Sequence, residues 1–290
     1  MSDLIFITGA TGNVGAEIVR QLSDREHRVR VAQRNLQHSR NWSPSSNVEY
    51  TEFDFTQPQT FAQAFQGVKR VFLMRPPALS QVKTYMYPAI DSAIASGVEQ
   101  IVFLSLLGAE SNPIVPHAKV EKYIQSVGIP YTFLRASFFM QNLSTTHRQD
   151  IQERKEIVLP AGKGKTSFID VRDIAAVGVK ALTESGHSDR AYSLTGSEAL
   201  DYYQVAEVFT EVLGKPITYT NPSIIKFALS LYKRGLDIQF IAVMIGIYTT
   251  AKLGFAGKLT TDTQDILQRA PISMRQFVED YRDCWVKPTL

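Results

Sequence analysis

Three glycines near the start of the chain have the spacing of a phosphate-binding turn. Residues 4–19 read LIFITGATGNVGAEIV, with Gly9, Gly12 and Gly15 three residues apart. A tight turn from a strand into a helix points free backbone N–H groups at the helix start, where the helix dipole adds partial positive charge. Glycine leaves room there for a pyrophosphate, so the segment predicts a dinucleotide site. The residues that we expect to form it are Gly9, Thr11, Gly12, Asn13, Val14 and Gly15.

The alternative is a purely structural turn, because the spacing is Gly-x-x-Gly-x-x-Gly and not the commoner Gly-x-Gly-x-x-Gly. The second strand favours one dinucleotide over the other. An NAD enzyme often has a carboxylate about 20 residues on, bonded to the ribose 2′-OH. This chain has Gln33, Arg34 and Asn35 there. Arg34 can pair with a 2′-phosphate in bidentate fashion, which favours NADP(H), unless it is a solvated surface charge.

Asp54 and Phe55 end the third expected strand, in the stretch VEYTEFDF. A sheet of this kind meets the adenine near that position, so both residues are candidates for contact with the cofactor. An ordinary strand end explains them equally well.

The elements that must position these residues alternate between strand and helix. Short apolar or alternating runs predict strands, and apolar stripes such as Val14, Ile18, Val19 and Leu22 predict helices. The expected strands are residues 4–8, 28–34, 48–55, 70–74, 100–106 and 131–137, and the expected helices are residues 13–26, 60–68, 87–98 and 117–128. This rhythm predicts an α/β fold, a Rossmann-type doubly wound parallel sheet with right-handed crossovers.

Past about residue 140 the alternation of strand and helix patterns becomes less regular. Residues 190–196 still resemble a core strand, and residues 202–214 resemble a helix. We therefore expect a nucleotide-binding Rossmann domain over residues 1–140, with a later contribution near 168–196. Residues 141–290 should form mainly the substrate-binding cap segments of a smaller C-terminal α/β domain. The apolar stretch from Phe240 reads as a buried or lid helix. Residues 222–256 as a whole suit a lid, a dimer face or a partner site.

Composition narrows the class of protein. The 290 residues are 44% hydrophobic, with a net charge of +3 and one cysteine, Cys284. Basic residues form no run, so nucleic acid is not implied. A lone cysteine and no signal peptide fit a cytoplasmic protein, and no stretch is apolar enough for a confident membrane span. The histidines, including His38, His147 and His187, lack metal-ligand spacing with Cys or carboxylates, which predicts no metal.

Together these motifs resemble the NmrA-like branch of the atypical short-chain dehydrogenase/reductase superfamily. Within it, the chain is most similar to the bacterial NADPH:quinone reductase and triphenylmethane-dye reductase group. The matching segments, which lie in the first 200 residues, are ITGATGNVG, VAQRN, GVEQIVFLS, HAKVEKYIQSVGIPYTFLRASFFMQN and FIDVRDIA. The resemblance implies a Rossmann domain with a small C-terminal substrate domain, and NADP(H) as cofactor.

It also implies that the nicotinamide lies near Met74, Arg75, Ser105 and the RASFF stretch that contains Phe138. Each of these has a plainer explanation. Arg75 could cap a loop, serine is common at strand ends, and Phe138, Phe139 and Met140 could belong to the core instead of facing a flat acceptor.

The resemblance further points to a departure from the superfamily's usual acid. Typical members carry Tyr-x-x-x-Lys on the helix after the fifth strand, whereas this chain has His117 and Glu121 in PHAKVEK. The quinone and dye reductase group resembles the chain here too. At i and i+4, Glu121 should favour the charged form of His117, which could then hydrogen-bond or protonate a quinone oxygen. A surface His–Glu pair without a catalytic role is the alternative.

Two functions from different classes fit these residues. The first is an NADPH-dependent reductase of quinones or similar flat conjugated acceptors, which transfers hydride directly without flavin. The second is a non-catalytic NADP(H)-binding redox sensor that acts through a protein partner, which the missing Tyr/Lys pair favours. A reductase of specialised metabolism related to isoflavone reductases ranks below both, because that group should carry a lysine where His117 stands. The oligomeric state stays open, with a homodimer as one alternative.

Overall fold

The computed structural model describes residues 3–36 and 47–286. Residues up to Ala136 together with Val171–Leu194 form one compact unit. Ser137–Asp170 together with the residues from Thr195 onward form a second. The chain therefore passes between the two units three times, after Ala136, Asp170 and Leu194.

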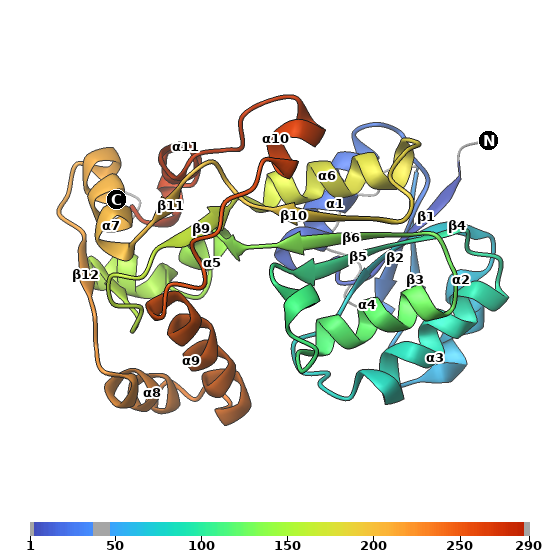
Figure 1. Cartoon of the computed structure of the whole chain (residues 1–290), viewed down its shortest axis with the longest axis horizontal. Helices are drawn as coiled ribbons and strands as arrows, with labels where there is room; N and C mark the ends of the chain where they lie inside the picture. The colour runs from blue at the N-terminus through green and yellow to red at the C-terminus, as the bar shows by residue number, and fades with distance from the viewer. Residues whose placement is uncertain (1–2, 37–46, 287–290) are drawn as a thin grey trace. The chain divides into compact units, whose positions relative to one another are not determined.

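The first unit is built on a sheet of seven parallel strands, ordered β10-β6-β5-β4-β1-β2-β3 (Figure 1). The strands are β1 (Leu4–Ile7), β2 (Val29–Gln33), β3 (Val48–Glu52), β4 (Val68–Met74), β5 (Gln100–Leu106), β6 (Tyr131–Ala136) and β10 (Arg190–Leu194). This is the doubly wound order, with an added edge strand. The α/β Rossmann-type fold expected from the sequence is confirmed.

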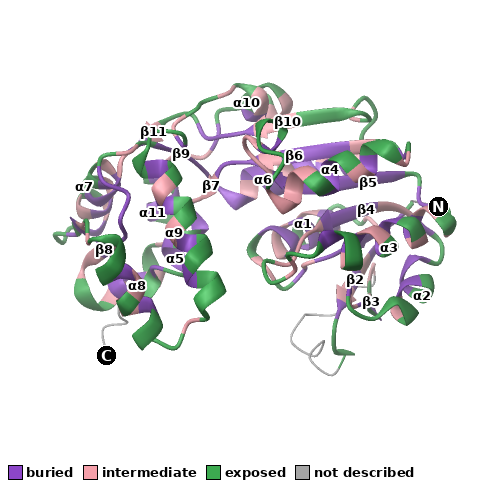
Figure 2. Ribbon diagram, turned by 60° about the horizontal axis from the view of Figure 1, so that its bottom comes forward, coloured by how far each residue is buried: buried purple, intermediate pink, exposed green. Residues whose placement is uncertain are grey.

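Helices cover both faces of this sheet, with α1 and α6 on one face and α2, α3 and α4 on the other (Figure 1). Their bounds are α1 Asn13–Ser23, α2 Phe61–Phe65, α3 Val82–Ala95, α4 Pro116–Ser126 and α6 Val171–Thr183. Strands covered on both sides read as continuous apolar runs. All four residues of β1 and six of seven in β5 are buried. The ribbon of β5 is purple, the colour of buried residues, in Figure 2.

Most expected elements of this unit agree with the structure, and the differences have local causes. The apolar stripe predicted for α1 is buried. Helix α3 begins at Val82, five residues before the expected start, and it carries Pro88 in its interior. Proline is favoured in the first turn of a helix, so the sequence suggested a later start. Strand β3 ends at Glu52 and not at Phe55, because the chain turns at Asp54.

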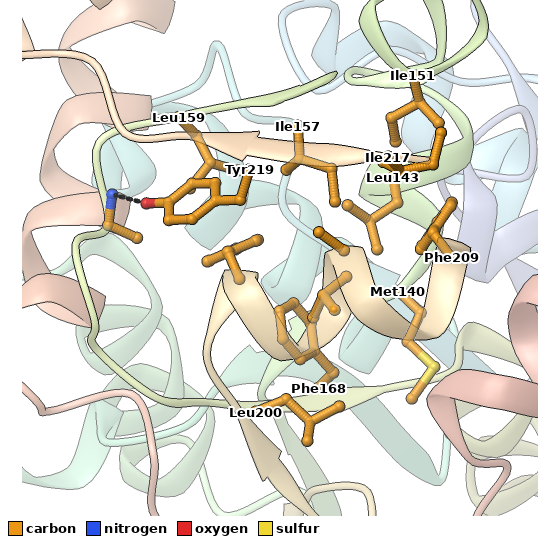
Figure 3. Close-up of a cluster of buried hydrophobic side chains, with 14 of the residues drawn as sticks. Met140, Leu143, Ile151, Ile157, Leu159, Phe168, Leu200, Phe209, Ile217 and Tyr219 are labelled. Atoms are coloured by element: carbon orange, nitrogen blue, oxygen red, sulfur yellow. Dashed lines mark hydrogen bonds between the residues drawn. The ribbon is translucent and has the colours of Figure 1, made fainter. Parts of the chain in front are cut away.

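The second unit has two small sheets and a set of helices around its own core. A three-stranded sheet joins β11 (Ala199–Leu200), β9 (Thr166–Ile169) and β7 (Phe138–Phe139), and β12 (Thr218–Thr220) pairs with β8 (Glu156–Val158). The helices are α5 Gln141–Ser144, α7 Tyr202–Leu213, α8 Ile224–Lys233, α9 Ile238–Lys252, α10 Asp262–Leu267 and α11 Met274–Asp280. Figure 3 shows part of the core, where the Tyr219 hydroxyl accepts a hydrogen bond from the Ala161 amide.

The turn after β1 is the tightest point of the first unit. Gly9 has a φ of +65°, and its carbonyl accepts a hydrogen bond of 2.9 Å from the Gly12 amide. A Cβ on Gly15 would lie 2.3 Å from that same carbonyl oxygen. Since both partners are backbone, only glycine at position 15 lets α1 start so close to the end of β1.

Replacing Gly15 by alanine should therefore destabilise the protein. We expect the free energy of unfolding to fall by about 1–3 kcal/mol, the usual cost of overpacking, as measured by urea denaturation. Gly246→Ala is the control, because Gly246 lies exposed within α9 and a Cβ there meets nothing within 4 Å. That change should be neutral or stabilise by up to about 1 kcal/mol. Equal stability of Gly15→Ala and the parent would contradict the close approach.

Candidate functional site

The strand order places the candidate site at the carboxyl ends of the central strands of the first sheet. The direction of winding reverses between β1 and β4, and ligands of such folds bind outside the carboxyl ends of the strands at that point. The glycine turn follows β1, and Arg75 follows β4. Thr8 joins the two strand ends, because its hydroxyl donates to the Phe72 carbonyl at 3.1 Å and accepts from the Met74 amide at 2.8 Å.

The glycine turn is shaped to take a phosphate. Helix α1 starts after Gly12, its first turn has no acidic residue, and no side chain among the described residues caps its first amides. Those amides and the positive end of the helix dipole are therefore available to an anion. Thr11 and Asn13 are exposed beside them. The Val14 side chain is buried, so Val14 has only its backbone amide to offer a ligand.

The residues expected near the adenosine end of the cofactor differ in their exposure and in the contacts that they already make. Arg34 follows the last residue of β2 and is exposed, as contact with a 2′-phosphate requires. One carboxylate oxygen of Asp54 accepts hydrogen bonds from the Thr56 amide and hydroxyl, both at 2.8 Å. Phe55 is 6% exposed and packs edge-on against Phe53, with 4.9 Å between the two ring centroids. The ordinary strand-end explanation accounts for these contacts of Asp54 and Phe55.

Three buried polar atoms without a partner gather beyond β4 and β5. They are Arg75 Nε, Ser105 Oγ and His117 Nδ1, which have no hydrogen-bond partner among the described residues. Ser105 is the sixth residue of β5 and His117 the second of α4, and the Arg75 charge acts on His117. Buried polar groups normally have partners, so these three atoms are candidates for hydrogen bonds to a ligand.

Arg75 folds back on its own loop. Its Nη1 donates to the carbonyls of Pro76, Pro77 and Leu79 at 2.9, 3.0 and 2.9 Å, and burial lowers the pKa of its guanidinium. Met74 lies against the glycine turn, since a Cβ on Gly9 would meet its Cε at 2.1 Å. The loop after β4 is thus held in place by its own arginine, beside the glycine turn.

The charge expected on His117 is wrong. Burial, with a smaller contribution from the Arg75 charge, lowers the pKa of His117 from 6.5 to about 4. The imidazole is therefore neutral at pH 7. It lies 6.1 Å from the Phe103 ring, centroid to centroid.

Glu121 cannot favour a charged His117, because another residue holds its carboxylate. Arg135 on β6 binds it in bidentate fashion, with Nε 3.1 Å from Oε1 and Nη2 2.7 Å from Oε2. Arg135 also pairs with Glu110 at 3.3 Å. Glu121 is 4% exposed, so it is not the solvated helix charge that the sequence suggested. The structure gives it a bridging role between α4 and β6.

Phe138 belongs to the second unit, in β7, where it lines a cavity together with Phe139. Met140, two residues on, is a core residue with 1% exposure. The same cavity contains a buried pair that the sequence did not reveal, His147 and Tyr248. These two residues are 101 positions apart, so no local pattern could have joined them.

Within residues 3–36 and 47–286, no three His, Cys, Asp or Glu side chains are grouped so that they could hold a metal ion. His38 lies outside these residues. Over the same part of the chain, no helix has both the length and the apolar character needed to cross a membrane.

The depressed pKa of His117 makes stability depend on pH. Between pH 6.5 and 4 the unfolded imidazole takes up a proton that the folded one refuses, so stability is lost as the pH falls through this window. His117→Gln should reduce that loss by up to about 3 kcal/mol, measured by denaturant unfolding at a series of pH values. Lys119→Gln, exposed on the same helix, is the control. An unchanged loss in His117→Gln would contradict the neutral, buried imidazole.

Comparison with known proteins agrees with this geometry. The model of the NmrA-like family matches residues 1–262. An NAD(P)H azoreductase from Xenophilus azovorans is 32% identical over 89% of this chain and 91% of its own length. The structure of an NADPH-dependent quinone oxidoreductase from Escherichia coli, complexed with NADPH, superposes with a TM-score of 0.86. It is 25% identical and covers 96% of this chain and 100% of that one.

Two further solved structures, at lower identity, share the fold. The triphenylmethane reductase of Citrobacter sp., complexed with NADP(H), has a TM-score of 0.84 at 23% identity, over 96% of this chain and 99% of that one. NmrA, a negative transcriptional regulator in complex with NADP, has a TM-score of 0.76 at 15% identity, over 96% and 95% of the chains. The resemblance drawn from the motifs is confirmed, and the chain belongs to the NmrA-like family.

Proposed function

We propose that this protein uses NADPH to reduce quinones or similar flat conjugated acceptors by direct hydride transfer. At the coarser level the chain is an oxidoreductase of the NmrA-like family with NADP(H) as its cofactor. The observation that carries the finer proposal is the group of orphaned polar atoms of Arg75, Ser105 and His117, at the strand edge that also carries the phosphate-binding turn.

The chain's residues fit the dinucleotide at two places. The amides at the start of α1, in the turn that contains Gly9, Gly12 and Gly15, would hold the pyrophosphate. Arg34 would pair with the 2′-phosphate. When bound, the reduced nicotinamide supplies the hydride.

His117 would act as a neutral hydrogen-bond donor to the acceptor's oxygen. With a proton on Nδ1, the buried imidazole has one N–H that no described residue accepts. A neutral imidazole is a weak acid, so it polarises a carbonyl and does not protonate it beforehand. This suffices for a quinone, whose reduced ring is aromatic and whose oxyanion is delocalised. A simple ketone, which needs a stronger acid, should be a poor substrate.

Arg75 and Glu121 would position His117 and would not act on the acceptor. The Arg75 charge disfavours protonation of His117, and the three carbonyls it binds fix the loop after β4. Glu121 ties α4 to β6 through Arg135, so it orients the helix that carries His117. Ser105 is buried and has no hydrogen-bond partner in the described part of the chain, so it is the second candidate donor to the acceptor or to the nicotinamide.

The names of the relatives support the acceptor class. An azoreductase, a quinone oxidoreductase and a triphenylmethane reductase are named for acceptors whose double bonds are conjugated.

The second candidate function is the NADP(H)-binding sensor, favoured by the absence of the Tyr/Lys pair at positions 117 and 121. A sensor would bind the dinucleotide in both oxidation states and consume neither.

Consumption of NADPH, followed by absorbance with a panel of quinones, tests the reductase. We expect turnover, and we expect His117→Ala to lower kcat/KM by about 10- to 100-fold, somewhat less than the loss of a donor at a localised oxyanion. Lys119→Ala, on the exposed side of α4, should leave turnover unchanged. An unchanged kcat/KM in His117→Ala would remove the residue from the mechanism. Tight NADPH binding without turnover of any acceptor would favour the sensor.

Arg34 decides the choice of dinucleotide in this proposal. Arg34→Ala should weaken NADPH binding at least about tenfold, because a charge-assisted pair is lost, and should leave NADH binding nearly unchanged. Isothermal titration calorimetry with each dinucleotide measures the difference. Arg28→Ala, an exposed arginine just before β2, is the matched control. An equal loss for NADPH and NADH would argue against pairing with the 2′-phosphate.

A further inference from the structure

The second unit contains a cavity formed by its own residues alone. Strand β7, α5 and the turn after it, β9, α7 and α9 all contribute to its wall. Most of the lining is apolar or aromatic, including Phe138, Phe139, Phe168 and Met244. The cavity has a volume of about 150 Å³. Cavities of about this size in protein interiors take up benzene, so the space fits one six-membered ring.

The cavity also exposes a polar pair to any ring inside it. His147 and Tyr248 both line it, and the His147 Nε2 atom lies 2.5 Å from the Tyr248 hydroxyl. The two side chains belong to residues only 3% and 6% exposed. Burial lowers the pKa of His147 to about 4 and raises that of Tyr248, so both groups are neutral.

A neutral pair of this kind offers a ligand two hydrogen-bonding patterns. When the imidazole N–H donates to the phenol oxygen, the phenol hydrogen is left to donate to a carbonyl. When the phenol donates to the imidazole, its oxygen is left to accept from a hydroxyl. The pair can therefore hydrogen-bond either member of a redox couple that differs by C=O and C–OH, and it does so as two neutral groups.

The cavity also accounts for an otherwise unexplained feature of α9. This helix is apolar on nearly every side, yet Val243 is 54% and Ile247 42% exposed. Both residues line the cavity. Exposed apolar side chains that surround an aromatic pocket are typical of a ligand's entrance, whereas isolated ones need no explanation.

We propose that this cavity binds an aromatic ring carrying a carbonyl or hydroxyl oxygen, with the Tyr248–His147 pair hydrogen-bonded to that oxygen. The part that names the quinone/hydroquinone couple as its ligand rests on the proposed function. The part that assigns a ring-binding site to the second unit does not, because it stands on the cavity's size, lining and polar pair.

Binding is measured on the full chain without NADPH, so that no turnover occurs. Methionine methyl groups are labelled with ¹³C, and Met244, which lines the cavity, reports on occupancy by NMR. Its signal is assigned from its loss in Met244→Leu. Phenol, hydroquinone and benzene are the ligands. We expect the Met244 signal to shift with each and phenol to bind about five- to tenfold more tightly than benzene, as one additional hydrogen bond predicts.

Two variants test the site. Tyr248→Phe should remove the preference for phenol over benzene, whereas Tyr232→Phe, exposed on α8, should retain it. Because Tyr248→Phe leaves His147 without its partner and could impair folding, Val243→Phe provides a second test. It fills the cavity from an exposed position and should weaken all three ligands at least about tenfold.

The outcomes separate this proposal from the proposed function. A Met244 signal that no ligand shifts, or an undiminished preference for phenol in Tyr248→Phe, would overturn the site. Ring binding in a protein that reduces no quinone would keep the site and remove the quinone couple as its ligand. If the protein does reduce quinones, KM should rise in both Val243→Phe and Tyr248→Phe. An unchanged KM in both variants would show that the acceptor binds elsewhere.

Discussion

The contact between Gly15 and the Gly9 carbonyl is the constraint on which the rest of the first unit depends. It sets how closely α1 follows β1, and so where the amides of the first helical turn lie. Thr8 fixes the end of β4 beside the same turn, at the point where the direction of winding of the sheet reverses. The backbone of Gly9 and the start of α1 thus meet at a position, Gly15, that tolerates no side chain.

His147, which is buried, and His117, which is partly buried, show how the surroundings determine the charge of a side chain. A solvent-exposed imidazole would be partly charged near neutral pH, but burial keeps both His117 and His147 neutral. For His117, the Arg75 charge acts in the same direction. The result is an imidazole that can donate a hydrogen bond without adding a charge. In the function that we propose, this property suits acceptors that stabilise their own negative charge, and no activated tyrosine is needed.

Features set by local sequence were predictable, and those set by tertiary contacts were not. The glycine turn, the strands of the first unit and the stripe of α1 follow from neighbouring residues, so their types and spacing were enough. The protonation state of His117 depends on the burial of its side chain and on the charge of Arg75, which lies 42 positions earlier in the chain. Glu121 looked like a surface charge because its partner, Arg135, lies on another element. The sequence offered no signal for the Tyr248–His147 pair.

The path of the chain between the two units has a consequence for its synthesis on the ribosome. Strand β10 pairs with β6, and α6 packs on α1. Both β10 and α6, however, come after Ser137–Asp170, the first segment of the second unit. Gly178 of α6 sits so close to Ile18 and Leu134 that a Cβ would be 3.3 Å from each. A nascent chain that has emerged only to Ala136 therefore exposes an apolar helix face and an unpaired strand edge. Such surfaces promote aggregation, so this interval is when the protein most needs a chaperone.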